Sequence, residues 1–292
     1  MSGGIPDPTA PLIPSGNLRR RQIFSKITEY AATAAAVLAV AVLALVVYTV
    51  VSRGAKAIDW EFITTSYPTG VAPMLVGTAI IVAIGTAIAM PLGVLIAIYL
   101  TEYAGSRGAG LLRTTLDLLN GIPSIILGLF VFKLLVYHKS QSGFAGSVAL
   151  AIIELPLIAR GTQEVLRLVP NSMREASEAL GVARWRSVLT VVLPSALGGI
   201  ITATVLAVAR AAGETAPLIL LSSIGPLDKV TVDPSEPLAN VPVFIYKLSE
   251  EGNPEGFATG WGIALLLISF ILFASLGARA LLARSKRKLA SS

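Results

Sequence analysis

Cysteine is absent from the sequence, and histidine occurs only once. The missing cysteine excludes disulfides, thiolate metal sites and cysteine nucleophiles. Charge is also scarce: charged residues make up 14% of the chain and hydrophobic residues 54%, far from the balance of a soluble domain. A phosphate-binding loop of the form G-x-x-x-x-G-K-(S/T) is missing as well. If ATP drives this chain, another subunit hydrolyses it, and we expect no catalytic residue, metal or cofactor on the chain itself.

Six apolar segments are long enough to span a bilayer, which takes about 20 residues of helix. They cover residues 27–51, 71–100, 111–136, 144–168, 188–224 and 260–282. Lipid offers the backbone no hydrogen bonds, so each segment is predicted to be helical. The sequence thus predicts an all-α integral membrane protein with six transmembrane helices. A disordered tail is expected over residues 1–26, and a basic tail over residues 285–292.

Lysine and arginine are distributed unevenly between the connections of these spans. One side carries Arg19, Arg20, Arg21, Lys26, Arg107, Arg113, Arg167, Arg174, Arg184, Arg186, Arg279, Arg284, Lys286, Arg287 and Lys288. The positive-inside rule therefore places both termini, and the connection between the fourth and fifth spans, in the cytoplasm. This topology accounts for the net charge of +6, and membrane lipid rather than nucleic acid is the expected partner.

A short polar segment separates the fourth span from the fifth. Pro170 ends the preceding helix, and Ser172 with Glu175 is predicted to form a capping box that starts a new one. Gly181 suits the position just after that helix, where the backbone needs a positive φ. These signals predict a short helix over about residues 171–185, outside the membrane and suited to contact with a partner. An amphipathic helix on the membrane surface is the alternative.

The same segment resembles the cytoplasmic loop of ABC importer membrane subunits, whose pattern is E-A-A-x3-G-x9-I-x-L-P. The matching residues are Glu175, Ala176, Gly181, Leu193 and Pro194, with Ser177 and Val191 as conservative replacements. In that family the loop is the coupling helix, which sits in a groove of the ATPase subunit. The resemblance implies the same role for this segment.

Ionisable side chains lie within the spans, where each costs roughly 2.5 to 3.5 kcal/mol on insertion scales. The fifth span contains Arg210 and Glu214, whose i,i+4 spacing predicts a shared helix face. The fourth span contains Arg160, Gln163 and Glu164. Arginine donates paired hydrogen bonds to tetrahedral oxyanions, so these residues indicate an anion path. Charge pairs that only hold helices together are the alternative.

The stretch from Arg210 to Leu218 is similar to the R-x-x-G-E-T-A-P-L signature of the PstA family, permease subunits of phosphate-specific ABC importers. Residues 155–170 also look like this family, except that Gln163 stands where the family pattern has glutamate, and Glu164 follows it. The resemblance implies a type I ABC importer permease fold over residues 71–284, in the plasma membrane. It also implies pairing with the sister permease PstC, two copies of the ATPase PstB with bound ATP–Mg, and the extracytoplasmic phosphate-binding protein PstS.

The long connection over residues 225–257 contains proline, glycine and acidic residues around a semi-apolar patch. Loops of this length are often functional, so Val243, Phe244 and Tyr246 are predicted to dock the binding protein. A passive lid is the alternative.

Other functions would explain part of the pattern. The nearest rival is an ABC permease for sulfate, molybdate or phosphonate. A secondary transporter that needs no ATP would account for the intramembrane charges but not for the capped cytoplasmic helix. A membrane scaffold or sensor that transports nothing would not need the buried charges.

Overall fold

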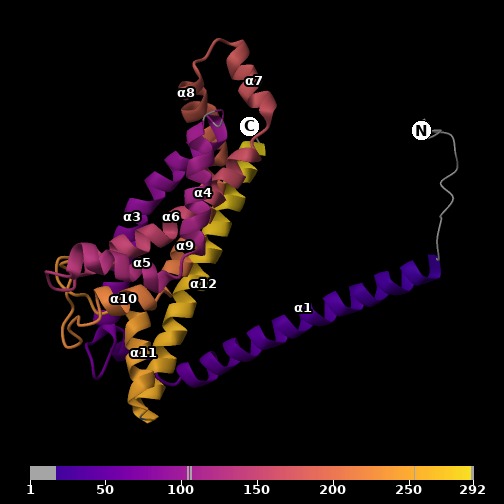
Figure 1. Ribbon diagram of the computed structural model, residues 1–292. Coiled ribbons are helices and arrows are strands. Elements are labelled where there is room, and N and C mark those ends of the chain that lie inside the picture. The colour runs from indigo at the N-terminus through magenta and orange to yellow at the C-terminus, as the bar shows by residue number, and fades with distance from the viewer. Residues whose placement is uncertain (1–17, 104, 106, 253, 291–292) are drawn as a thin grey trace, which may run out of the picture. The chain divides into compact units, whose positions relative to one another are not determined.

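The structure is a computed structural model that describes residues 18–103, 105, 107–252 and 254–290. All regular elements in these residues are helices (Figure 1). The chain divides into two compact units, Met1–Val51 and Ser52–Ser292, which are described separately. The helical architecture agrees with the fold class that the sequence predicts.

The first unit consists of most of α1 (Leu18–Gly54). This helix includes residues 18–26, which corrects the predicted disordered tail over that stretch. Arginine, glutamine and lysine are good helix formers, so the helix begins before the apolar run does. Residues 1–17 lie outside the described residues. Large apolar side chains of α1, such as Leu38 and Leu45, are exposed, as suits a helix surrounded by lipid or by other membrane helices.

Four long helices form the centre of the second unit. They are α3 (Ala72–Glu102), α6 (Gly143–Arg167), α9 (Leu193–Ala211) and α12 (Pro254–Ala290). α3 packs along α6, α6 packs on α9, and α9 packs on α12. The closest approaches need glycine: a Cβ added to Gly93 would lie 2.9 Å from Cγ2 of Ile158. Such contacts are expected in membranes, because lipid leaves helix association to close packing and hydrogen bonds.

The third predicted span consists of two helices. α4 (Arg107–Gly121) is followed by α5 (Ser124–Val131) and the π-helix η1 (Phe132–Val136), and the chain bends by 102° at the break. Pro123 causes the break, because proline disfavours helical backbone in the residue before it. When the bent pair counts as one span, the described residues contain six segments able to cross a membrane, the number predicted from the sequence.

The fifth predicted span also contains a break. Its helix runs from α8 (Arg184–Ser187) through the π-helix η2 (Val188–Val192) into α9, and it ends at Ala211. A short turn then leads into α10 (Ala216–Leu221). Pro217 therefore lies in the first turn of α10, where proline is tolerated, and does not kink a longer helix.

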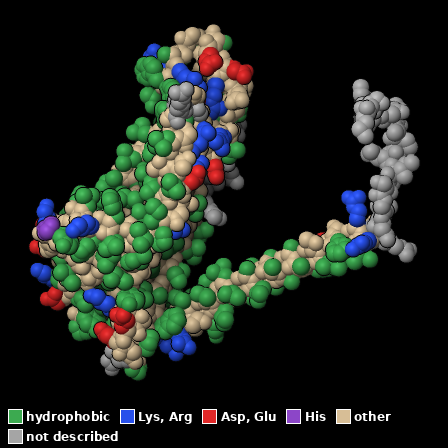
Figure 2. Space-filling model, in the orientation of Figure 1, with side chains coloured by type: hydrophobic (Ala, Val, Ile, Leu, Met, Phe, Trp, Pro, Cys, Tyr) green, Lys and Arg blue, Asp and Glu red, His purple; other side chains and the backbone are tan. Residues whose placement is uncertain are grey.

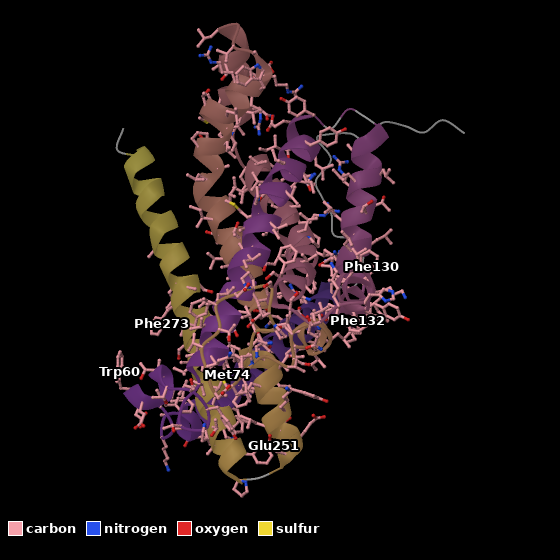
Figure 3. The ribbon with its side chains drawn as sticks, turned by 90° about the vertical axis from the view of Figure 1, so that its left-hand side faces the viewer. Trp60, Met74, Phe130, Phe132, Glu251 and Phe273 are labelled. Carbon is pink, nitrogen blue, oxygen red and sulfur yellow. The ribbon has the colours of Figure 1, made fainter. Side chains whose placement is uncertain are left out.

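The two ends of the second unit differ (Figure 1). One end carries α7 (Asn171–Ala179) and α8. The other end carries α10, α11 (Val241–Glu251) and, as the Trp60 label in Figure 3 shows, the short helix α2 (Trp60–Thr64). Asn240 begins α11, since its side chain accepts a hydrogen bond from Val243 N at 3.2 Å.

Hydrophobic side chains dominate the visible surface between these two ends (Figure 2). Some project from the bundle, as Phe273 of α12 does in Figure 3. This residue is 71% exposed. Met74 lies inside and is fully buried. An apolar exterior of this kind suits contact with lipid or with another membrane-embedded chain.

Candidate functional site

The segment predicted to contact a partner forms two short helices, α7 and α8, here called the α7–α8 hairpin (residues 171–187). Pro170 is the N-cap residue of α7, with ψ of 137°, and no side chain caps this end. The predicted capping box of Ser172 and Glu175 is therefore wrong. The extended backbone of Pro170 leads the chain directly into α7, so Ser172 already lies within the helix.

The other end of α7 is closed by a Schellman motif. Gly181 has φ of +71°, its N–H donates to Glu178 O at 2.9 Å, and Val182 N donates to Ser177 O at 3.1 Å. These bonds satisfy two carbonyls of the last helical turn. Glycine adopts this backbone conformation without steric cost, so the predicted positive φ at Gly181 is confirmed.

The residues of the E-A-A pattern lie on two faces of α7. Glu175 and Ala176 are exposed, whereas Ser177 is buried and donates to a carbonyl of the preceding turn at 3.0 Å. Beyond them, the side chains of Leu180 and Trp185 are 83% and 61% exposed. Large apolar side chains exposed on a polar hairpin are typical of a surface that contacts another protein.

Leu193 and Pro194 occupy a different place from the rest of the pattern. They begin α9, after the π-helix η2. Leu193 packs against a core cluster that includes Val192 and Ile200, while Pro194 is exposed. These two residues therefore belong to the point where the hairpin re-enters the bundle, and the exposed hairpin surface lies elsewhere.

Arg160 on α6 is held by three groups. It forms an ion pair with Asp117 of α4, and it donates to Arg113 O and to Gln163 Oε1, each at 3.4 Å. Gln163 is 2% exposed, and its Nε2 has no hydrogen-bond partner in the described chain. No ion pair joins Arg160 to Glu164 within these described residues. The acidic partner that the sequence left open is thus Asp117, on another helix.

Arg210 lies in the last turn of α9, and Glu214 lies beyond the end of that helix. The predicted shared helix face is therefore wrong, because the helix ends at Ala211. The two side chains still form an ion pair, with Arg210 Nε 3.5 Å from Glu214 Oε1. The Arg210 side chain is 60% exposed and that of Glu214 is 14% exposed. Within the described chain, the terminal nitrogens of Arg210 make no hydrogen bond, so they are open to a ligand.

Arg210 borders two hollows in the second unit. A cavity of about 170 Å³ is also lined by Asn120 and Ser124, at the break between α4 and α5. A groove of about 720 Å³ between α6 and α9 is also lined by Glu164. The structure thus brings Arg210 together with Glu214 and with the groove of Glu164, and it leaves Arg160 and Gln163 in a separate cluster.

A further hollow of about 730 Å³ lies among α3, α9 and α12. Its lining is almost entirely apolar, with threonine hydroxyls as the main polar groups and no charged side chain. None of its lining residues could neutralise the charge of an anion, whereas Arg210 borders both the 170 Å³ cavity and the groove.

Sequence reasoning assigned no role to Glu154, which is fully buried in α6. Its Oε2 accepts a hydrogen bond from Thr86 Oγ1 of α3 at 2.9 Å, and Oε1 has no such partner within the described chain. Glu102 was missed in the same way, although it pairs with Arg174. The signal that could have identified Glu154 was an acidic residue at membrane depth, which needs a reason to be there; Glu102 lies at the end of α3, where no such signal applies.

The predicted docking patch at the α11 end is mostly buried. Val243 and Phe244 are 3% and 4% exposed and belong to core clusters, so their predicted docking role is corrected. α11 is amphipathic and packs this face onto α3 and α12. Tyr246 is 43% exposed. Its hydroxyl donates to Glu250 Oε1 at 2.6 Å, and this hydrogen bond raises the pKa of the phenol.

Charged side chains beside helix breaks, in a helical bundle with an apolar exterior, are typical of a membrane subunit that moves a solute across the bilayer. The family model described as "Binding-protein-dependent transport system inner membrane component" matches residues 89–287. The chain belongs to this family, and within it to the PstA permeases. It is therefore a multi-pass permease subunit of an ABC transporter and not itself an enzyme.

Two curated relatives support this placement. The chain is 36% identical to the phosphate transport system permease protein PstA of Xylella fastidiosa (strain Temecula1) over 246 residues, which cover 82% of this chain and 85% of the relative. It is 34% identical to PstA 1 of Mycobacterium tuberculosis (strain H37Rv) over 288 residues, which cover 94% of this chain and 92% of the relative.

Solved structures share the fold. A chain of the MetNI methionine ABC transporter in an inward-facing conformation aligns with a TM-score of 0.60 and 20% identity, over 77% of this chain and 96% of that one. A chain of a bacterial alginate ABC transporter, solved in complex with an alginate-bound periplasmic protein, aligns with a TM-score of 0.62 and 15% identity, over 90% and 97%. The helical arrangement is therefore that of ABC importer permeases.

Proposed function

We propose that this chain is a membrane permease subunit of an ATP-driven importer for inorganic phosphate, and that it forms half of the translocation path. The curated relatives described above are phosphate transport permeases. The observation that carries the proposal is the exposed guanidinium of Arg210, at the end of α9 beside a cavity. A charged side chain with unused donors at this depth is costly, and an anionic ligand is the simplest reason to keep it.

Arg210 and Glu214 are the proposed centre of the path. Phosphate is a tetrahedral oxyanion, and a guanidinium can donate two parallel hydrogen bonds to it. Because Glu214 contacts Nε at 3.5 Å, the terminal nitrogens are free for the ligand. The nearby carboxylate offsets the positive charge, so phosphate is not held too tightly to leave, and it can accept a proton from a protonated phosphate.

The remaining path residues lie closer to the α7–α8 end of α6. Glu164 lines the same groove as Arg210, so it contributes a second carboxylate. Arg160 and Gln163 form the cluster with Asp117, and in this proposal they hold α4 against α6 and attract the anion over a distance. Their contribution is expected to be smaller, since both terminal nitrogens of Arg160 already donate to protein groups.

The α7–α8 hairpin is the proposed contact with the ATPase. Glu175, Ala176, Leu180 and Trp185 present the exposed face of the hairpin. Ser177 bonds to the preceding turn of α7, and Gly181 ends that helix. Leu193 and Pro194 begin α9, the helix that leads back to Arg210. A displacement of the hairpin by the ATPase would thus reach the path along α9.

The proposed assembly contains this chain, the sister permease PstC, two copies of the ATPase PstB carrying ATP–Mg, and the phosphate-binding protein PstS. Both termini and the α7–α8 hairpin face the cytoplasm, as the distribution of lysine and arginine indicates. The opposite end then meets the binding protein, and Tyr246 is the exposed member of the predicted docking residues. Relatives named as phosphate transport system permeases support this set of partners.

The experiment that tests the proposal is uptake of labelled phosphate at low concentration, in a strain that lacks this gene and in the same strain with the gene restored. Unlabelled phosphate, sulfate, molybdate and phosphonate serve as competitors, and a strain without the ATPase is measured alongside. We expect uptake that needs both the gene and the ATPase and that only unlabelled phosphate suppresses. Competition by another oxyanion would overturn the substrate, and uptake without the ATPase would overturn the coupling.

A further inference from the structure

Arg174 is the most completely bonded arginine in the described chain, yet it lies on the hairpin and outside the anion path. Its side chain is 19% exposed, and that of its partner Glu102 is 4% exposed. Nε donates to Glu102 Oε2 at 3.3 Å and to Oε1 at 3.2 Å, and Nη2 donates to Oε1 at 2.8 Å. Two nitrogens of one guanidinium thus hold one carboxylate, which is the strong geometry for such a pair.

The same guanidinium also closes the end of α6. Nη1 donates to Val169 O at 2.6 Å, and Nη2 donates to Leu166 O at 2.9 Å. The second hydrogen of Nη1 reaches Asn171 Oδ1 at 3.4 Å. Every N–H of Arg174 therefore has an acceptor, and the acceptors come from three elements: the last residue of α3, the end of α6 and the first residue of α7.

This position decides how the hairpin is connected to the bundle. α7 follows α6 directly in the chain and packs on α8 and η2, so covalent links already carry it to α6 and α9. α3 is remote in sequence from the hairpin, and side chains alone join the two. Besides Arg174 on Glu102, Arg184 of α8 stacks over the Tyr103 ring, with its Cζ 5.4 Å from the ring centroid. The hairpin thus contacts the last residue of α3, Glu102, and the C-cap residue that follows it, Tyr103.

We propose that the Arg174–Glu102 pair is the link that makes α3 follow the α7–α8 hairpin when the ATPase moves it, so that Arg174 is a positioning residue for transport. The proposal rests on the proposed function, because it requires an ATPase that acts on the hairpin. α3 packs along α6 and carries Thr86, the partner of the buried Glu154. If the hairpin moved without α3, then α3 and its contact with Glu154 would stay in place while ATP is consumed.

The test compares four forms of the whole transporter, assembled with its partner subunits and reconstituted in vesicles. They are the wild type, Arg174→Met, the double variant Arg174→Met with Glu102→Met, and the control Arg167→Met. Arg167 is exposed at the end of α6, so its variant removes the same side chain nearby without touching the link. Phosphate uptake, ATP hydrolysis and the amount of assembled complex are measured for each.

We expect Arg174→Met to lower phosphate moved per ATP hydrolysed by roughly 5-fold or more, the lower range of measured site-to-site coupling. The control should keep the wild-type ratio. An apolar pair in place of a buried ion pair usually preserves folding, so the double variant should assemble normally and remain uncoupled. Normal coupling in the double variant, or a loss of complex with an unchanged ratio in Arg174→Met, would show a purely structural pair and overturn the proposal.

The result for the wild type distinguishes a failure of the proposed substrate from a failure of the Arg174–Glu102 link. If it transports another oxyanion and not phosphate, the proposed substrate fails, and the same ratio is then measured for that anion in all four forms. If it transports phosphate and Arg174→Met has the wild-type ratio, the link fails and the proposed function stands.

Discussion

Arg160 and Arg210 are both arginines on helices of the same bundle, but their surroundings differ. Arg160 is occupied by Asp117, by the carbonyl of Arg113 and by Gln163. Among the described residues, the Arg210 side chain pairs with Glu214 alone, with Nε 3.5 Å from Oε1, and 60% of it is exposed. An arginine whose terminal nitrogens are engaged by neighbouring helices holds those helices together, whereas one with unused terminal nitrogens beside a cavity can bind an anion.

The difference arises from where each arginine stands on its helix. Arg160 lies within α6, where α4 packs alongside and supplies a carboxylate and a carbonyl. Arg210 stands in the last turn of α9, where the chain turns away, and within the described residues only Glu214 pairs with its side chain. The arginine at the helix end therefore keeps unused donors, whereas the arginine within a helix is paired by the helix that packs beside it.

The largest expected effect is on Arg210. Arg210→Gln should reduce phosphate uptake per assembled complex by roughly 100-fold or more, because it removes two charge-assisted hydrogen bonds worth about 1.5–3 kcal/mol each. Labelled uptake in vesicles, divided by the amount of complex, measures this. Arg210→Lys is the matched control. It keeps the charge but loses the planar guanidinium, so its uptake per complex should lie between that of the wild type and that of Arg210→Gln. Wild-type uptake in Arg210→Gln would remove Arg210 from the path.

Arg160→Gln tests whether the two arginines have different roles: if their roles were the same, this variant would lose phosphate uptake as Arg210→Gln does. We expect instead a loss of stability of about 1 kcal/mol, because the pair with Asp117 is partly exposed and such pairs contribute little. The thermal midpoint of the purified complex should fall while uptake per complex stays close to that of the wild type. If uptake is abolished in fully assembled complex, Arg160 belongs to the anion path as directly as Arg210 does.

A change in the hairpin separates coupling from the path. An alanine side chain at Gly181 would meet open space, but φ of +71° costs an L-residue about 1 to 2 kcal/mol. Gly181→Ala should therefore weaken binding of the ATPase to the permease by roughly 10-fold, the equivalent of 1.4 kcal/mol. Gly181→Asn, which tolerates this conformation better, should lose less. Titration of the ATPase onto permease in nanodiscs measures both, and equal affinities for the two variants would contradict the backbone explanation.

The smallest expected effect is that of Gln163→Glu. A carboxylate keeps the oxygen that accepts from Arg160, and it replaces Nε2, which makes no hydrogen bond in the described chain, so no existing contact of the Arg160 cluster is lost. Uptake should stay within about twofold of the wild type, less than ~0.5 kcal/mol. A larger loss would show that the neutral amide matters for phosphate transport, and that the Arg160 cluster does more than hold α4 against α6.

Local signals predicted much of this molecule. The apolar runs identified the membrane segments, because the length of helix needed to cross lipid is set by the bilayer. Gly181 was predicted correctly because a positive φ at a helix end is a local property of the backbone. The stretch from Arg210 to Leu218 identified the family, which the match over residues 89–287 confirms.

Contacts between distant segments were beyond these signals. Asp117 and Arg160 are separated by 43 positions, and Glu102 and Arg174 by 72, so no local spacing relates them. Val243 and Phe244 were predicted to dock the binding protein because they lie in a semi-apolar patch of a long connection. They are buried because α11 turns that face onto the bundle.

By itself, the sequence determined that this protein is a helical membrane permease with charges in its spans and a separate short polar segment between two of them. Those properties follow from composition and from interactions within a few residues along the chain. Only the tertiary structure decided which charges are engaged and which are free. Whether an arginine finds a partner depends on which helix packs beside it, and helix packing is set by the shapes of surfaces that are far apart in the sequence.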